Sequence, residues 1–280
     1  MSALRLVLVA SVAALTLAAC NRDREKAADP AAPSAAAPAT TADAGAPLAY
    51  ESKNAFASVK LTLPPALKTQ PDLHAALYAG AVRDLRQFVE GAQADRTEAG
   101  GDAGMPPYEK IIEIQPGAET GKLFSLKRQD YDFTGGAHGN TLFAGVLWDK
   151  AMKRQITVAD LFRKGVDMRA LDQALCAAAN AAKRQRVPDA EPVSLDPARG
   201  TMWSCPKALE TPFVLTPGTV AGKAGGLTFL IGAYQLGPYV EGPYEVVVPQ
   251  SALRALLAPA YADEFAGAPV KTGDAPAPRG

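Results

Sequence analysis

Two Ala/Pro-rich segments limit which part of this 280-residue chain can fold. Residues 27–49 contain twelve alanines and four prolines, with no large apolar residue before Leu48. Such a segment cannot bury enough apolar surface to offset the entropy lost on ordering. Residues 266–280 have a similar composition. We therefore predict a linker over 21–49, a disordered tail over 266–280, and a folded part of about residues 50–265.

The first twenty residues resemble the signal peptide of a bacterial lipoprotein. Leu6 to Leu17 form an apolar run behind a short positive region, and the sequence Leu-Ala-Ala-Cys ends at Cys20. The run is too short to span a bilayer, which takes about 20 apolar residues. The resemblance implies lipidation of Cys20, and Asn21 implies delivery to the outer membrane. An ordinary secretory signal with a chance cysteine is the alternative. We expect a lipid-anchored protein on the periplasmic side of the cell envelope.

The charge balance argues against a nucleic-acid partner. Removing residues 1–20 takes one arginine and no acid from 29 basic and 29 acidic side chains, which leaves a net charge of about −1. Phosphate binding requires an excess of basic residues. The oligomeric state cannot be read from the sequence.

Cys176 and Cys205 are the two cysteines left if Cys20 is lipidated. An exported compartment allows them to form a disulfide, and the alternative is two separate buried thiols. A zinc site is not expected, because the chain has no Cys-x-x-Cys pair and only two histidines, His74 and His138.

Hydrophobic periodicity predicts an α+β fold of two small domains, with helices packed on mostly antiparallel sheets. The first domain, residues 50–135, is expected to be β-α-β-β, with strands near 57–63, 108–114 and 121–133, a helix over 71–90 and a loop over 93–106. In the last of these strands the apolar residues change parity, and this change predicts a bulge near Arg128.

The second domain is predicted over residues 136–265. Its expected strands are 141–148, 155–157, 212–216, 219–222, 227–234 and 244–248, and its expected helical segments are 160–162, 168 to before 188, and 251–257. Pro188 must end the long helix, because a proline inside a helix removes a hydrogen bond and clashes with the preceding turn.

A glycine-rich loop in YDFTGGAHGNT, residues 131–141, is the most distinctive local motif. Its glycines permit close approach of a ligand or another chain, so Tyr131, His138 and Asn140 are candidate binding residues. The alternative is a tight turn in which His138 bonds to nearby backbone. No serine or cysteine lies beside His138 in the sequence to act as a nucleophile.

A second motif, GPYVEGPY over residues 237–244, presents tyrosines on a proline-braced path. Tyrosine combines apolar area with a polar tip, which suits binding surfaces. Tyr239, Glu241 and Tyr244 are therefore candidate binding residues, together with Tyr234 just before the motif. The alternative is a bulge whose tyrosines pack into the core.

Motifs of the common catalytic families are missing. Ser204-x-x-Lys207 matches a catalytic pattern by letter only, and neither Gly-x-Ser-x-Gly, His-Glu-x-x-His nor a phosphate-binding loop occurs. The scattered acidic residues leave open a glycosidase-like carboxylate pair. We expect no catalytic residues, no cofactor and no metal.

Three segments, YDFTGGAHGNT (131–141), ITVADLF (156–162) and AYQLGPYVEGPYEVVVPQSAL (233–253), resemble the extracellular module of RsiV-type anti-sigma factors. A similar module precedes the catalytic domain of some PdaC-type peptidoglycan deacetylases. In the RsiV type the module binds lysozyme. No segment for membrane spanning or sigma-factor binding is recognisable here, so the resemblance does not imply an anti-sigma role.

These observations together predict a membrane-tethered, non-catalytic lipoprotein. Its expected ligand is a cell-wall-active protein, such as a lysozyme-like hydrolase, or a peptidoglycan fragment. One alternative is a hydrolase acting on wall polymers through His138 and acidic neighbours. The other is a structural envelope protein without a ligand.

Overall fold

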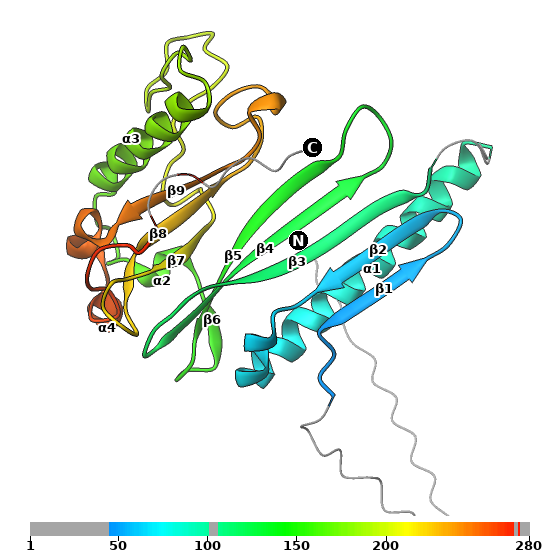
Figure 1. The fold of residues 1–280 in the computed structure, drawn as a ribbon, viewed down its shortest axis with the longest axis horizontal. Helices are drawn as coiled ribbons and strands as arrows, with labels where there is room; N and C mark the ends of the chain where they lie inside the picture. Colours follow the sequence, from blue (N-terminus) through cyan, green and yellow to red (C-terminus); the bar gives the residue numbers. More distant parts are fainter. Residues whose placement is uncertain (1–44, 101–105, 272–273, 275–280) are drawn as a thin grey trace, which may run out of the picture. The chain divides into compact units, whose positions relative to one another are not determined.

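The computed structural model describes residues 45–100, 106–271 and 274. The predicted signal peptide, lipidation at Cys20 and most of the linker lie outside the described residues. The predicted α+β class is confirmed, because helices pack on two separate sheets that are mostly antiparallel (Figure 1). Within the described part, no helix is both long and apolar enough to cross a membrane.

The larger sheet has six strands, paired in the order in which they occur along the chain. Only the β2–β3 pair is parallel, and it is joined by helix α1 (Pro71–Glu98). The alternation of burial along β2 shows that one face of this sheet is covered. The strands are β1 (Ala49–Lys53), β2 (Ala57–Thr62), β3 (Tyr108–Glu119), β4 (Leu123–Phe133), β5 (Asn140–Asp149) and β6 (Arg154–Ile156).

Helix α1 covers that face with residues spaced three or four apart. Leu73, Ala81 and Leu85 are fully buried against side chains such as Leu61 and Ile112. The helix begins with a proline at its first position, where the missing N–H costs nothing. It ends at Glu98 and so includes residues 93–98, which the sequence analysis assigned to a loop. Only Ala92 is buried beyond residue 90, so this last part lacks the apolar periodicity that identifies a helix from sequence.

The smaller sheet pairs β7 (Phe213–Pro217), β8 (Ala224–Ile231) and β9 (Tyr244–Pro249), all antiparallel. Helix α3 (Arg169–Arg186) buries Leu171, Leu175 and Ala179 in the same core as alternate residues of these strands. Two short helices, α2 (Val158–Leu161) and α4 (Pro259–Ala262), complete this part (Figure 1).

One predicted element of this part is wrong, and another is confirmed only in part. Residues 219–222 form a turn rather than a strand, because Gly218 N–H donates to Lys223 O and Gly222 has a positive φ of 67°. The helical segment predicted over 251–257 is present as two short 3-10 helices, at Gln250–Ala252 and Arg254–Leu256, and not as one continuous helix. Both turns bring Leu253 and Leu257 into the core, as a helix would have done.

Strand β4 has no bulge near Arg128, contrary to the prediction. Its pairing with β5 is regular from Leu123 to Asp132, and the register shift of this sheet lies in β3 between Pro116 and Glu119. The apolar parity changes because Phe124 and Leu126 pack on the α1 side, whereas Tyr131 and Phe133 point to the opposite face. Tyr131 and Phe133, at the end of β4, are only half-buried on that face.

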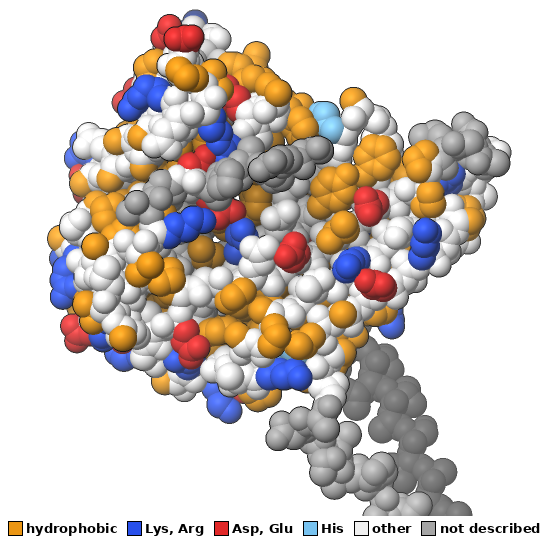
Figure 2. All heavy atoms as spheres, in the orientation of Figure 1, with side chains coloured by type: hydrophobic (Ala, Val, Ile, Leu, Met, Phe, Trp, Pro, Cys, Tyr) orange, Lys and Arg blue, Asp and Glu red, His pale blue; other side chains and the backbone are white. Residues whose placement is uncertain are grey.

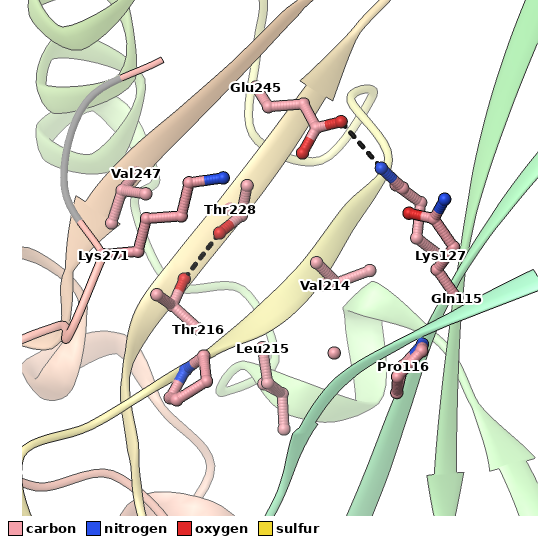
Figure 3. A pocket seen from close by; sticks show the side chains of 12 residues that line it. Gln115, Pro116, Lys127, Val214, Leu215, Thr216, Thr228, Glu245, Val247 and Lys271 are labelled. Carbon is pink, nitrogen blue, oxygen red and sulfur yellow. Dashed lines mark hydrogen bonds and ion pairs between the residues drawn. The ribbon is translucent and has the colours of Figure 1, made fainter. Parts of the chain in front are cut away.

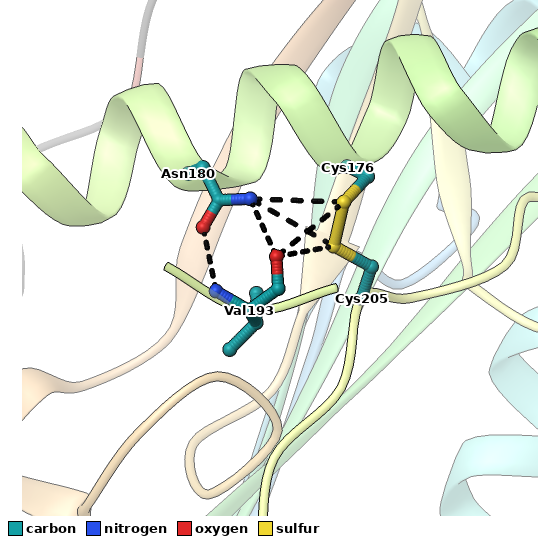
Figure 4. Close-up of a disulfide and its surroundings, with 4 residues drawn as sticks. All are labelled: Cys176, Asn180, Val193 and Cys205. Atoms are coloured by element: carbon teal, nitrogen blue, oxygen red, sulfur yellow. Dashed lines mark hydrogen bonds between the residues drawn. A yellow bond between two sulfur atoms is a disulfide. The ribbon is translucent and has the colours of Figure 1, made fainter. Parts of the chain in front are cut away.

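Cys176 and Cys205 form a disulfide, as predicted, which ties α3 to the segment that leads into β7 (Figure 4). Asn180, one helical turn after Cys176, fixes the facing loop. Its side-chain amide donates to Val193 O at 2.8 Å and accepts from Val193 N–H at 2.9 Å. The disulfide and the Asn180 side chain therefore hold the same loop against α3.

The two sheets meet closely where glycine permits it. A side chain at Gly145 of β5 would collide with the carbonyl of Phe213 in β7, and Leu215 N–H donates to Ser125 Oγ at 3.0 Å. The described residues from 45 onward belong to one compact unit. Strands β5 and β6 lie in the larger sheet although they follow residue 135, so the boundary between two small domains stays a prediction.

Ordered contacts extend beyond residue 265, where the sequence analysis ended the folded part. Thr219 N–H donates to Ala268 O at 2.8 Å, and Val270 N–H donates to Pro217 O at 2.9 Å. The chain after α4 thus runs alongside the turn between β7 and β8.

Candidate functional site

Three aromatic side chains from two distant segments meet at the protein surface. The rings of His138 and Tyr239 are stacked, with centroids 3.6 Å apart and an interplanar angle of 11°. Tyr234 lies 5.5 Å from Tyr239 between centroids, and its hydroxyl oxygen is 3.3 Å from His138 Nε2. We call these three residues and Tyr131, which packs beneath the same loop, the aromatic surface.

Tyr131 supports this loop from below. A side chain at Gly139 would collide with the Tyr131 ring, so only glycine allows the loop to lie on it. Burial and the nearby Glu109 carboxylate raise the pKa of the Tyr131 hydroxyl, which keeps it a neutral phenol. Tyr239, in the loop between β8 and β9, contacts the same loop from the other side, because its hydroxyl donates to Gly139 O at 2.9 Å.

The histidine makes the backbone contact of the tight-turn alternative and a second contact to Tyr234. Its Nδ1 lies 2.9 Å from Gly139 O, as in the tight-turn alternative, and its Nε2 faces Tyr234. The ring is nevertheless exposed, as is that of Tyr234. His138 is therefore held in place by backbone while one side of its ring system stays accessible.

Tyr234 has an unusual backbone conformation. Its φ of 67° is in the left-handed region, which costs a residue with a Cβ about 1–2 kcal/mol. Tyr234 is nevertheless 55% exposed, so packing in the core does little to offset this cost. Strained residues that persist at a surface are concentrated at functional sites.

The loop that carries Tyr234 and Tyr239 is anchored from beneath by Glu241. This carboxylate accepts two hydrogen bonds of 2.8 Å from Lys183 of α3 and one of 2.6 Å from the Tyr244 hydroxyl. The side chains of Lys183 and Glu241 are only 6% and 8% exposed. Two predicted binding residues, Glu241 and Tyr244, thus lie under the loop, where they position it and are not accessible to a ligand.

Asn140, the remaining predicted binding residue, is exposed at the start of β5, opposite Asp132 of β4. It borders the aromatic surface through its neighbour Gly139. The structure therefore brings Tyr131, His138, Tyr234 and Tyr239 together, with Asn140 at the edge.

A hollow lies between the two sheets. The cavity has a volume of about 240 Å³ and is lined by residues of β3, β4, β7, β8 and β9 (Figure 3). Lys127 of β4 reaches Glu245 of β9 across it at 2.8 Å, and Thr216 bonds Thr228 at 2.7 Å. None of these polar residues is among the predicted binding residues. The alternation along β9 could have indicated that Glu245 faces away from the core.

The surrounding surface mixes charges of both signs. On the face shown in Figure 2, basic and acidic side chains alternate, and hydrophobic side chains gather over strands β3 to β5. Among the residues that the structure describes, no group of three or more His, Cys, Asp or Glu could hold a metal ion. The site offers ring faces and hydroxyl groups.

The fold and the site define a two-sheet α+β protein with an exposed aromatic surface where loops of the two sheets meet. Residues 159–251 match the family described as Protein of unknown function (DUF3298). This region includes the loop with Tyr234 and Tyr239 but not the loop with His138.

The solved structures that are similar to this chain include two crystal structures of DUF3298 proteins. A DUF3298 family member from Bacteroides fragilis is 19% identical, with a TM-score of 0.51 over 74% of this chain and 88% of that one. A DUF3298 family protein from Pseudomonas aeruginosa is 17% identical, with a TM-score of 0.47 over 78% and 94% of the respective chains. No curated protein matches the sequence. The Bacteroides likeness establishes a shared fold.

Proposed function

We propose that this protein is a membrane-tethered, non-catalytic binding lipoprotein of the cell envelope. Its partner would be a cell-wall-active protein such as a lysozyme-like hydrolase, bound through the aromatic surface. The observation that carries the proposal is the meeting of His138, Tyr234 and Tyr239 at an exposed site, although about a hundred residues separate the two segments.

The chemistry of the surface favours a protein partner. Tyrosine is enriched at the centres of protein interfaces, where its ring supplies large contact area at a low entropic cost. Val240, next to Tyr239, is 88% exposed and adds apolar area to the same loop. Exposed polar residues, Gln235 and Asn140, flank these rings in the sequence and provide a polar rim.

The identity of the partner rests on the sequence resemblance. Two of the three segments that resemble the lysozyme-binding RsiV module, 131–141 and 233–253, are the segments that form the aromatic surface. A ligand site assembled from those two segments would explain why they share the resemblance. A peptidoglycan fragment is the second ligand to test.

The non-catalytic part of the proposal rests on the surroundings of His138. Its two ring nitrogens face the Gly139 carbonyl oxygen and the Tyr234 hydroxyl, so neither of these contacts supplies a serine or cysteine that the imidazole could activate as a nucleophile. Glu241, the carboxylate of the loop that carries Tyr239, is bound to Lys183.

Capture and turnover assays on the purified protein test this proposal. We expect it to retain a lysozyme-like hydrolase in a pull-down and to release no product from peptidoglycan. Binding to peptidoglycan alone would redirect the proposal to the glycan. Binding to neither would favour a structural envelope protein, and turnover abolished by His138→Ala would establish a hydrolase.

A further inference from the structure

A buried polar site lies at the end of α3. It is beneath the loop that carries Tyr234 and Tyr239 and beside the hollow between the sheets. Here the carboxylate of Asp274, beyond the last α-helix, is only 6% exposed. Its Oδ1 accepts a hydrogen bond of 2.8 Å from the Glu245 main-chain N–H, and its Oδ2 pairs with Arg186 Nη2. Both oxygens of the carboxylate are therefore bound.

The groups that bind Asp274 are held in place by other contacts. Arg186 donates from Nη1 to Glu241 O at 2.7 Å and to Pro243 O at 2.6 Å. Its guanidinium also lies 4.0 Å from the centre of the Tyr244 ring. The N–H of Glu245 belongs to strand β9, whose position is fixed by pairing with β8. The arrangement of donors would therefore persist if Asp274 moved away.

Such a fixed pair of donors is a carboxylate-binding site. The guanidinium supplies a charged donor of defined direction, and the main-chain N–H supplies a second one for the other oxygen. We propose that Arg186 and the Glu245 N–H form a binding site for a carboxylate of a peptide partner, which Asp274 of the same chain occupies in the free protein.

The occupant is suited to displacement. Burial raises the pKa of the Asp274 carboxyl in spite of the hydrogen bond from the Glu245 N–H and the charge of Arg186, so the buried position favours the charged form of Asp274 less than solvent does. The last backbone hydrogen bonds that the described chain makes before Asp274 are those of Ala268 O with Thr219 N–H and of Val270 N–H with Pro217 O. Lys271 then lines the hollow beside Glu245 and Val247 (Figure 3).

The partner's carboxylate could come from an acidic side chain or from a chain terminus, and both would use the same donors. Three probes distinguish these sources. Acetyl-Gly-Asp-amide carries a side-chain carboxylate, acetyl-Gly-Ala carries a terminal one, and acetyl-Gly-Asn-amide is the neutral control. Titration of each probe is followed by the amide resonance of Glu245.

We expect Asp274→Ala, and a chain ending at Lys271, to bind at least one charged probe ten or more times more tightly than the natural chain. An internal ligand that fills the site nine-tenths of the time lowers apparent affinity about tenfold. Asp189→Asn, a change at an exposed aspartate after α3, should leave the affinity unchanged.

Equal affinity of the natural chain and Asp274→Ala would overturn the proposal. So would an equal response to the neutral probe, or undiminished binding by Asp274→Ala that also carries Arg186→Gln. The site does not depend on ring contacts of Tyr234 or His138, so it can fail or hold independently of the aromatic surface.

Discussion

At the scale of single residues, Tyr234 is the position where stability and proposed function conflict most clearly. A tyrosine with φ of 67° adopts a conformation that glycine or asparagine adopts at less cost. Its exposed ring contributes little to the core. The simplest account is that the ring is presented for a ligand, at a cost that the anchored loop around Glu241 can tolerate.

Glu264 allows a prediction about acid stability. Burial alone would raise the pKa of its carboxyl, but hydrogen bonds from Thr120 and from the Lys122 N–H, at 2.7 Å, lower it below the usual value. A lowered folded-state pKa stabilises the protein above the unfolded pKa, and this stabilisation is lost as the pH falls through the folded pKa.

Glu264→Gln should therefore lower the free energy of unfolding at pH 7 and make it depend less on pH below about 4.5. Urea unfolding at pH 7 and pH 3 measures both effects. Equal losses of stability at the two pH values would show that the charge of Glu264 has no part in it.

At the scale of elements, the disulfide secures a loop that has little regular structure. The chain between α3 and β7 contains no helix or strand, and its contacts to the helix include Cys176–Cys205 and the Asn180 amide. A cross-link over a separation of 29 residues reduces the entropy of the unfolded chain.

Replacing both cysteines by serine should reduce the free energy of unfolding by about 3–4 kcal/mol. Chemical denaturation under non-reducing conditions measures this, and a thiol count on the denatured mature protein provides the control. Two reactive thiols in the natural protein would contradict the pairing.

Elements with strong periodicity could be predicted, and those set by tertiary contacts could not. The strand over 57–62 and the core of α1 follow from alternation and three-to-four spacing. The end of α1 at Glu98 and the 3-10 form of the helical turns at 250–256 could not be predicted, because few of their residues are buried in a periodic pattern. The sequence of β4 shows that the apolar residues switch from even to odd positions. This switch arises because the two ends of the strand place apolar side chains on opposite faces of the sheet, and not because of a bulge.

At the scale of the whole molecule, the two sheets meet in a way that no local pattern reveals. The sequence could nominate Tyr131, His138, Tyr234 and Tyr239 separately, as tyrosines and a histidine in glycine- and proline-rich loops. It could not show that the loops touch, nor that Glu241 and Tyr244 lie beneath them. The contact between the loop of His138 and the loop of Tyr239 depends on the close approach of the two sheets at Gly145. It also depends on Lys183 and Arg186, which anchor the second loop.

The most direct test of the central claim is the binding of a lysozyme-like hydrolase by Tyr234→Asn, measured by calorimetry alongside thermal unfolding. Asparagine keeps the left-handed backbone and removes the ring, so we predict binding weaker by about 1 kcal/mol or more with an unchanged or higher Tm. Met202→Ala, a change at an 80% exposed residue of another loop, should leave both unchanged. Unchanged binding by Tyr234→Asn would contradict the account, as would a loss of affinity that only accompanies a fall in Tm.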